Sequence, residues 1–186
     1  MVSLAELNRM GREAFVAAVG SAWERSPWVA AAAWERRPFR DLGELHRAMV
    51  AALRAAPHER RLALIRAHPD LAAPRPTRKR VPVRRTGTRH RAAVAAELTA
   101  ESTREQASAG LDRLTAGELE RFQGLNGAYK ARFGFPFVVC VREHTRASIL
   151  AAFEERLGQT AEQEVETALG EIAKIARLRL EEKIGS

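Results

Sequence analysis

Apolar residues recur along most of the chain at three- and four-residue spacing, which is the pattern of helices that bury one face. Capping residues and prolines stand where several of these segments would begin. The segment from Ser3 to Val19 fits two short helices or one broken helix. Further helices are predicted to begin at Pro27, Asp41, Pro57, Ala92, Ser102, Thr115, Arg146 or Ser148, and Thr160, the last running to about Lys183.

The helical pattern breaks at three places. Pro69 disfavours helical geometry in the residue before it, so the preceding helix should end at His68. Gly134 and Pro136 interrupt the Phe-Gly-Phe-Pro-Phe segment, which therefore cannot continue a helix. Residues 74–91 hold three prolines, a glycine and three threonines without apolar periodicity, which predicts a mobile loop.

The composition agrees with helices. Ala, Leu, Arg and Glu dominate, and these residues favour helix over strand. A chain of 186 residues can build one core that buries about 70% of the unfolded surface. We therefore predict an all-α fold, with one compact multi-helix domain over residues 1–186.

Cysteine usage and the longest apolar runs point to the cytoplasm. The single cysteine, Cys140, cannot form an intramolecular disulfide, and the N-terminus lacks a basic stretch followed by an apolar core. Arg, Glu, Gly or Pro interrupts every long apolar run, so we expect no membrane span. The lone cysteine and the scattered histidines lack metal-ligand spacing, so no metal site is predicted.

A net charge of +8 and a pI near 10.8 would be typical of a nucleic-acid-binding protein. Eight Lys or Arg residues lie in the 74–91 loop without an acidic residue, so the rest of the chain is formally neutral. One hypothesis is that this loop grips phosphate. Against this hypothesis, the basic charge lies in one proline-containing loop and no helix shows a basic recognition face.

His68 is a candidate acid–base residue. It follows Leu64 by four positions and Ile65 by three, so it projects from the apolar side of its helix where the helix stops. The residues alone favour a structural role, in which the ring caps the preceding carbonyls. The functional alternative is general acid–base catalysis, because an unperturbed imidazole titrates near pH ~6.5. The other histidines, His46, His58, His90 and His144, fall in polar or basic surroundings and look like surface residues.

Ser102-Thr103-Arg104-Glu105 has the spacing of a capping box, in which serine and glutamate satisfy the first amides of a helix. On this interpretation Gln106 is a polar surface residue. A helix N-terminus also favours an anionic ligand, and the two interpretations are compatible.

Arg179 falls within the apolar stripe of the last predicted helix. An arginine on a buried face needs a partner, because a desolvated unpaired charge is costly. The partner is either a carboxylate of the same chain or a carboxylate or ureide carbonyl of a ligand. The stripe consists of Val165, Leu169, Ile172 and Ala176.

The segment from Phe135 to Val141 is core or pocket wall on either interpretation. Its non-helical backbone would present N–H and C=O groups to a planar polar ligand.

Taken in order, these segments resemble the 2-oxo-4-hydroxy-4-carboxy-5-ureidoimidazoline (OHCU) decarboxylase family, whose members complete the conversion of urate to S-allantoin without a cofactor. The resemblance covers nearly the whole chain. The segment 74–91 departs from it, being longer and more basic than the usual connection. Of a lid, a patch for an anionic partner and a tolerated insertion, we favour the tolerated insertion, because lengthening a flexible loop costs little. The motifs that carry the resemblance are His68-Pro69-Asp70-Leu71, Glu101 to Gln106, Leu125-Asn126 to Tyr129, and Phe133 to Val139.

The resemblance implies a lyase that acts on a small ureidoimidazoline, needs no cofactor and forms a homodimer. It assigns catalysis to His68, Glu105 and Arg179, with His68 as the essential acid–base residue. The implied substrate-binding residues are Pro69, Ser102, Gln106, Phe137, Val138, Val139, Cys140 and Val141.

Overall fold

The computed structural model describes residues 1–73 and 98–185, and helices make up nearly all the regular structure in these ranges. The all-α prediction is therefore confirmed. The basic loop predicted at 74–91 and the start of a helix at Ala92 lie outside the described residues. Within the two described ranges, no helix is long and apolar enough to cross a membrane.

Some of the helices lie in residues 1–73 and the others in residues 98–185. The segment from Ser3 to Val19 forms two short helices, one of the two predicted arrangements. Residues 1–73 form α1 (Leu4–Arg9), α2 (Arg12–Val19), α3 (Trp28–Ala33), α4 (Leu42–Ala55) and α5 (His58–Arg66), with 3₁₀ turns η1 (Gly20–Ala22) and η2 (Trp34–Arg36). Residues 98–185 form α6 (Ala100–Ser108), α7 (Ala116–Phe133), η3 (Val141–Glu143), α8 (Arg146–Arg156) and α9 (Ala161–Lys183).

Local capping chemistry sets several helix starts. The Asp41 carboxylate accepts the Glu44 amide and opens α4, as predicted. Thr115 opens α7 through a complete capping box, and Thr160 opens α9 in the same way. Thr145 caps α8, so that helix begins at Arg146, one of the two predicted positions.

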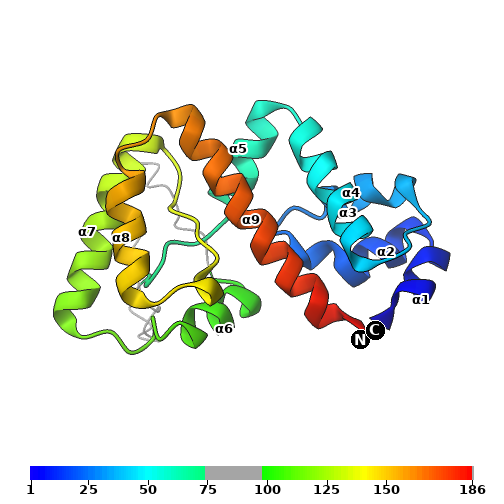
Figure 1. Cartoon of the computed structure of the whole chain (residues 1–186), viewed down its shortest axis with the longest axis horizontal. Helices are drawn as coiled ribbons and strands as arrows, with labels where there is room; N and C mark the ends of the chain where they lie inside the picture. Colours follow the sequence, from blue (N-terminus) through cyan, green and yellow to red (C-terminus); the bar gives the residue numbers. More distant parts are fainter. Residues whose placement is uncertain (74–97, 186) are drawn as a thin grey trace, which may run out of the picture.

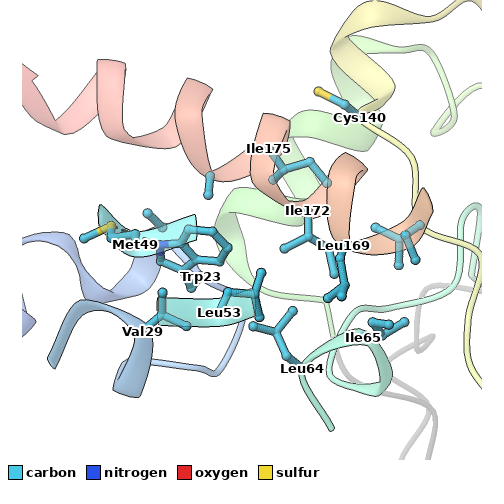
Figure 2. Close-up of a cluster of buried hydrophobic side chains, with 14 of the residues drawn as sticks. Trp23, Val29, Met49, Leu53, Leu64, Ile65, Cys140, Leu169, Ile172 and Ile175 are labelled. Atoms are coloured by element: carbon cyan, nitrogen blue, oxygen red, sulfur yellow. Dashed lines mark hydrogen bonds between the residues drawn. The ribbon is translucent and has the colours of Figure 1, made fainter. Parts of the chain in front are cut away.

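Helix α9 is the structural centre of the molecule. It packs against α2, α4 and α5, and Figure 1 shows it running between the N-terminal helices and the layer of α7 and α8. Its predicted apolar stripe is buried. In Figure 2, Leu169 and Ile172 point from α9 toward Leu53 and Leu64, which joins the two halves through one core.

The two ends of the chain lie side by side (Figure 1). Strand β1 (Val2–Ser3) pairs in parallel with β2 (Ile184–Gly185), which follows α9 directly. No helical pattern predicted this pair. It fixes the last turn of α9 beside the first helix.

Two helix boundaries differ from the predictions. Helix α5 ends at Arg66 rather than His68, because the His68 amide turns back to the Ile65 carbonyl in a tighter bond. Helix α6 begins at Ala100, capped by Thr99, so the capping box predicted at Ser102 is wrong.

Candidate active site

A pocket of about 460 Å³, a volume that includes its opening to solvent, lies between the end of α5, helix α6, the segment before η3, and α9. Every residue that the sequence singled out for catalysis or binding lines it. These residues are His68, Pro69, Ser102, Glu105, Gln106, Arg179 and the five residues from Phe137 to Val141. Leu71, Arg142, Ile175 and Leu178, which were not predicted, also line the pocket.

Arg179 is 2% exposed and pairs with two carboxylates. Its Nε and Nη2 atoms each lie 2.7 Å from an oxygen of Glu105, and Nη1 lies 2.9 Å from Glu24 Oε2. Burial alone would lower the pKa of the guanidinium, but the two carboxylates outweigh it and raise the pKa above its ordinary value. Of the two kinds of partner left open for this arginine, the carboxylate of the same chain is therefore present, and present twice.

Ser102 and Glu105 have other partners than a capping box would give them. The Ser102 hydroxyl donates to Glu24 Oε2 over 3.0 Å and accepts from Arg179 Nη2 over 3.2 Å. Glu105 turns to Arg179 instead of reaching back along α6. These tertiary contacts leave the capping role to Thr99, whose hydroxyl accepts the Ser102 amide.

Glu24 belongs to this cluster although no sequence pattern marked it. It lies in the turn between η1 and α3 and is 2% exposed. Burial raises the pKa of its carboxyl, but the charge and hydrogen bond of Arg179 reverse the effect and hold that pKa below its ordinary value. A turn has no periodicity, so a single sequence carried no signal for this residue.

His68 is 5% exposed and its ring Nδ1 lies 3.0 Å from the Leu64 carbonyl oxygen. A carbonyl only accepts, so Nδ1 carries the proton and the lone pair of the neutral ring is on Nε2. The capping contact of the structural interpretation is thus present, in a ring that also lines the pocket.

The pKa of His68 is lowered to about 4, chiefly by burial and to a smaller extent by the positive charge of Arg179. The Glu24 carboxylate and the bond to Leu64 act in the opposite direction. The imidazole is therefore neutral at pH 7 and is able to accept a proton.

Gln106 fixes the chain just after His68 and is half-buried, which corrects its interpretation as a surface residue. Its Oε1 accepts the Ala72 amide over 3.1 Å, and its Nε2 donates to the Asp70 carbonyl over 3.2 Å. Ala72 has a positive φ of 52°, a conformation that a residue with a side chain rarely adopts without support. The Gln106 amide supplies that support.

The left-handed backbone of Gly134 ends α7, and the non-helical segment that follows forms one pocket wall with its residues Phe137 to Val141. Arg156 donates to the Val138 carbonyl over 2.8 Å, and the Cys140 amide donates to Glu171 over 2.7 Å.

Two groups in this wall bear on its chemistry. Within the described part of the chain, the N–H and C=O of Val139 make no hydrogen bond, so they remain available to a ligand. Burial raises the pKa of the Cys140 thiol to about 11, so that thiol is neutral at pH 7 and a poor nucleophile.

His46 also differs from its expected surface position. Its Nε2 lies 2.8 Å from the Ala173 carbonyl, and the ring is half-buried. Among the described residues, no group of three or more His, Cys, Asp or Glu side chains is arranged to hold a metal ion.

A buried neutral imidazole beside a paired arginine, in a small pocket with unpaired backbone groups, is the arrangement of an enzyme that acts on a small polar molecule. Residues 8–181 match the family model described as OHCU decarboxylase, and the chain belongs to that family.

Relatives named 2-oxo-4-hydroxy-4-carboxy-5-ureidoimidazoline decarboxylase match nearly end to end. The protein of Haloferax volcanii is 41% identical over 100% of this chain and 98% of its own length. The protein of Mus musculus is 37% identical over 100% of this chain and 94% of its own.

Two solved structures share the fold. A crystal structure of (S)-allantoin synthase has a TM-score of 0.72 and 30% identity over 98% of this chain, which spans 54% of that longer chain. A crystal structure of OHCU decarboxylase in the presence of (S)-allantoin has a TM-score of 0.61 over 93% of this chain and 97% of that one, and at 20% identity it supports the fold alone.

Proposed function

We propose that this protein decarboxylates OHCU and releases (S)-allantoin, the last step in the breakdown of urate to allantoin. The observation that carries the proposal is the single pocket that holds buried, neutral His68 together with the Arg179–Glu105 pair. Membership of the family over residues 8–181, and full-length relatives named for this reaction, support it.

The structure of OHCU determines what the pocket has to do. One ring carbon carries both a hydroxyl and the carboxylate, and its neighbour, which bears the ureido group, is joined to nitrogen by the ring double bond. When the bond to the carboxylate breaks, its electron pair moves into that C=N bond and the nitrogen gains a proton from solvent. The resulting enol becomes allantoin when the hydroxyl loses its proton and the ureido-bearing carbon gains one.

His68 performs the proton transfers of this last step. Its neutral ring accepts the hydroxyl proton at Nε2, because Nδ1 is held by the Leu64 carbonyl. The imidazolium then returns a proton to the ureido-bearing carbon. A single fixed donor protonates one face of that carbon, which yields one enantiomer.

Arg179 and the pocket wall orient the ring. Within the described part of the chain, Glu105, Glu24 and Ser102 use four of the five guanidinium donors, which leaves one Nη1 hydrogen for a substrate oxygen. The Val139 backbone supplies one donor and one acceptor to the planar ligand. The remaining proposed binding residues are Pro69, Gln106, Phe137, Val138, Cys140 and Val141.

The test is circular dichroism of the allantoin formed from urate by urate oxidase and hydroxyisourate hydrolase, with and without this protein. We expect rapid appearance of the S-enantiomer signal, lost in His68→Asn. Unchanged slow formation of racemate in the presence of the folded protein would reject the proposed function.

We further propose that the chain forms one domain over residues 1–186 and acts as a cytoplasmic homodimer, an assembly suggested by the family resemblance. Light scattering after gel filtration tests the dimer. The competing nucleic-acid hypothesis depends on residues 74–91, which lie outside the described residues, and no comparison supports it. Its test is salt-dependent binding that disappears when the loop is deleted.

A further inference from the structure

Glu24 joins three separate parts of the chain beneath the pocket. From the turn after η1, its Oε2 accepts from Arg179 on α9 and from Ser102 on α6. Its other oxygen, Oε1, is buried and makes no hydrogen bond within the described structure. A buried carboxylate oxygen without a donor calls for an explanation beyond packing.

Charge balance shows why packing is an insufficient explanation. Glu105 alone already meets Arg179 with two parallel hydrogen bonds, which makes a neutral pair. Glu24 adds a second carboxylate, so the cluster carries a net charge of about −1 in a buried site. Burying an unbalanced charge costs free energy, so stabilisation of the fold does not by itself account for a glutamate at position 24.

The excess charge has a use when His68 is protonated. Two buried charges act on the imidazole from different elements, Arg179 from α9 and Glu24 from the turn before α3. Glu105, on α6, is engaged with Arg179. During turnover the ring briefly becomes positive close to Arg179, and the Glu24 carboxylate offsets that repulsion together with the Leu64 carbonyl at Nδ1.

We propose that Glu24 is a positioning residue that aligns the Arg179 guanidinium and the Ser102 hydroxyl and stabilises the protonated form of His68. The inference rests on the proposed function for its kinetic part only. Glu24 touches no reacting atom, because it acts through Arg179, Ser102 and its charge.

The direct test is NMR titration of the His68 ring in the intact protein, with His68→Asn used to assign the signal. Glu24→Gln and Glu24→Met both remove the charge, and both leave Arg179 paired with Glu105. We expect each to lower the pKa of His68 by at least about one unit. Glu24→Asp retains the charge and should restore the titration to within about half a unit.

Glu164→Gln is the matched control. Glu164 is equally buried and accepts from Arg156 as Glu24 accepts from Arg179, but it lies on the far side of the pocket wall. Its loss should destabilise the fold without moving the His68 titration. A general effect of removing any buried carboxylate would move both.

Turnover gives the second readout. Glu24→Gln should lower kcat at least ~10-fold with KM within about threefold, and Glu24→Asp should recover most of the loss. An unchanged His68 titration in whichever charge-removing variant folds would overturn the proposal. An inactive wild-type protein would instead reject the proposed function, because the titration is read without turnover.

Discussion

Arg179 and Glu105 meet side by side, with both nitrogen–oxygen distances at 2.7 Å, although 74 positions separate them in the chain. The pair connects α9 with α6 across the floor of the pocket. Only a guanidinium offers two parallel donors of this geometry, so the pairing fixes the orientation of the whole guanidinium in the pocket.

Replacing Arg179 with lysine keeps the charge but loses the parallel donors. We expect kcat/KM to fall at least ~10²-fold, because the lysine ammonium cannot bind Glu105 and Glu24 and still orient the ring of the substrate. Steady-state kinetics beside thermal unfolding measure the two effects. Arg177→Lys is the control, since Arg177 is half-buried on the same helix, outside the pocket lining, and pairs with Glu181; equal losses in both variants would contradict the assignment.

Replacing His68 with asparagine should lower kcat by at least ~10²-fold, because it removes the group that accepts and returns the proton. Stopped-flow circular dichroism of (S)-allantoin formation gives the rate. His58→Asn, at an exposed histidine, should retain activity. Near-normal turnover by a folded His68→Asn protein would leave His68 with the structural role alone.

His68 also predicts how stability depends on pH. Its folded pKa, lowered to about 4 by burial, lies below the value of ~6.5 in an unfolded chain. Between these two pH values the unfolded chain binds a proton at His68 that the folded protein does not bind. The contribution of neutral His68 to the free energy of unfolding is therefore complete above pH ~6.5 and is lost as the pH falls toward 4. The loss amounts to about 3 kcal/mol of the free energy of unfolding.

Urea unfolding at a series of pH values measures that loss. In His68→Asn the same pH interval should show a shallower decline, because the titrating group is gone. An equally steep decline would assign the acid sensitivity to the carboxylates instead.

Arg156 should act on substrate affinity from outside the pocket. It donates to the Val138 carbonyl, pairs with buried Glu164 and stacks over the Phe137 ring at 4.3 Å. Among the described residues, Arg156→Met leaves the Glu164 carboxylate with Tyr129 as its one side-chain partner, which should cost about 3–5 kcal/mol of stability. Because the Val138 carbonyl loses its hydrogen bond, the Phe137 to Val141 wall should hold its position less well, and we expect the KM for substrate to rise.

The double variant Arg156→Met, Glu164→Met separates the two effects. It removes the stranded charge, so it should be more stable than Arg156→Met in urea unfolding, whereas KM stays high because Val138 has still lost its donor. Recovery of KM together with stability would show that the wall does not depend on this bond.

Local chemistry made much of the fold predictable. Asp41, Thr115 and Thr160 cap their helices through residues three positions away, so a short stretch of sequence contains the whole interaction. Arg179 could be found because its position within an apolar stripe required a buried partner. Its partners could not be named from the stripe.

Long-range contacts decided what the sequence could not. Glu24 lies 78 positions from Ser102 and 155 from Arg179, and a turn gives no pattern to reveal it. Thr99 and Ser102 both precede a plausible helix start, and the choice between them depended on Glu24, which withdrew the Ser102 hydroxyl from capping. The pairing of β1 with β2 involves two residues from each strand, too few for a pattern.

Neighbouring residues of α6 serve two different halves of the pocket. Glu105 holds Arg179 on α9, whereas Gln106 holds the backbone on either side of Leu71. Each residue added to a helix rotates everything beyond it by about 100°. A single insertion between Thr99 and Glu105 would therefore break the contacts of Glu105 with Arg179 and of Gln106 with the backbone around Leu71. This helix can accept changes of side chain on its outer face but no change of length.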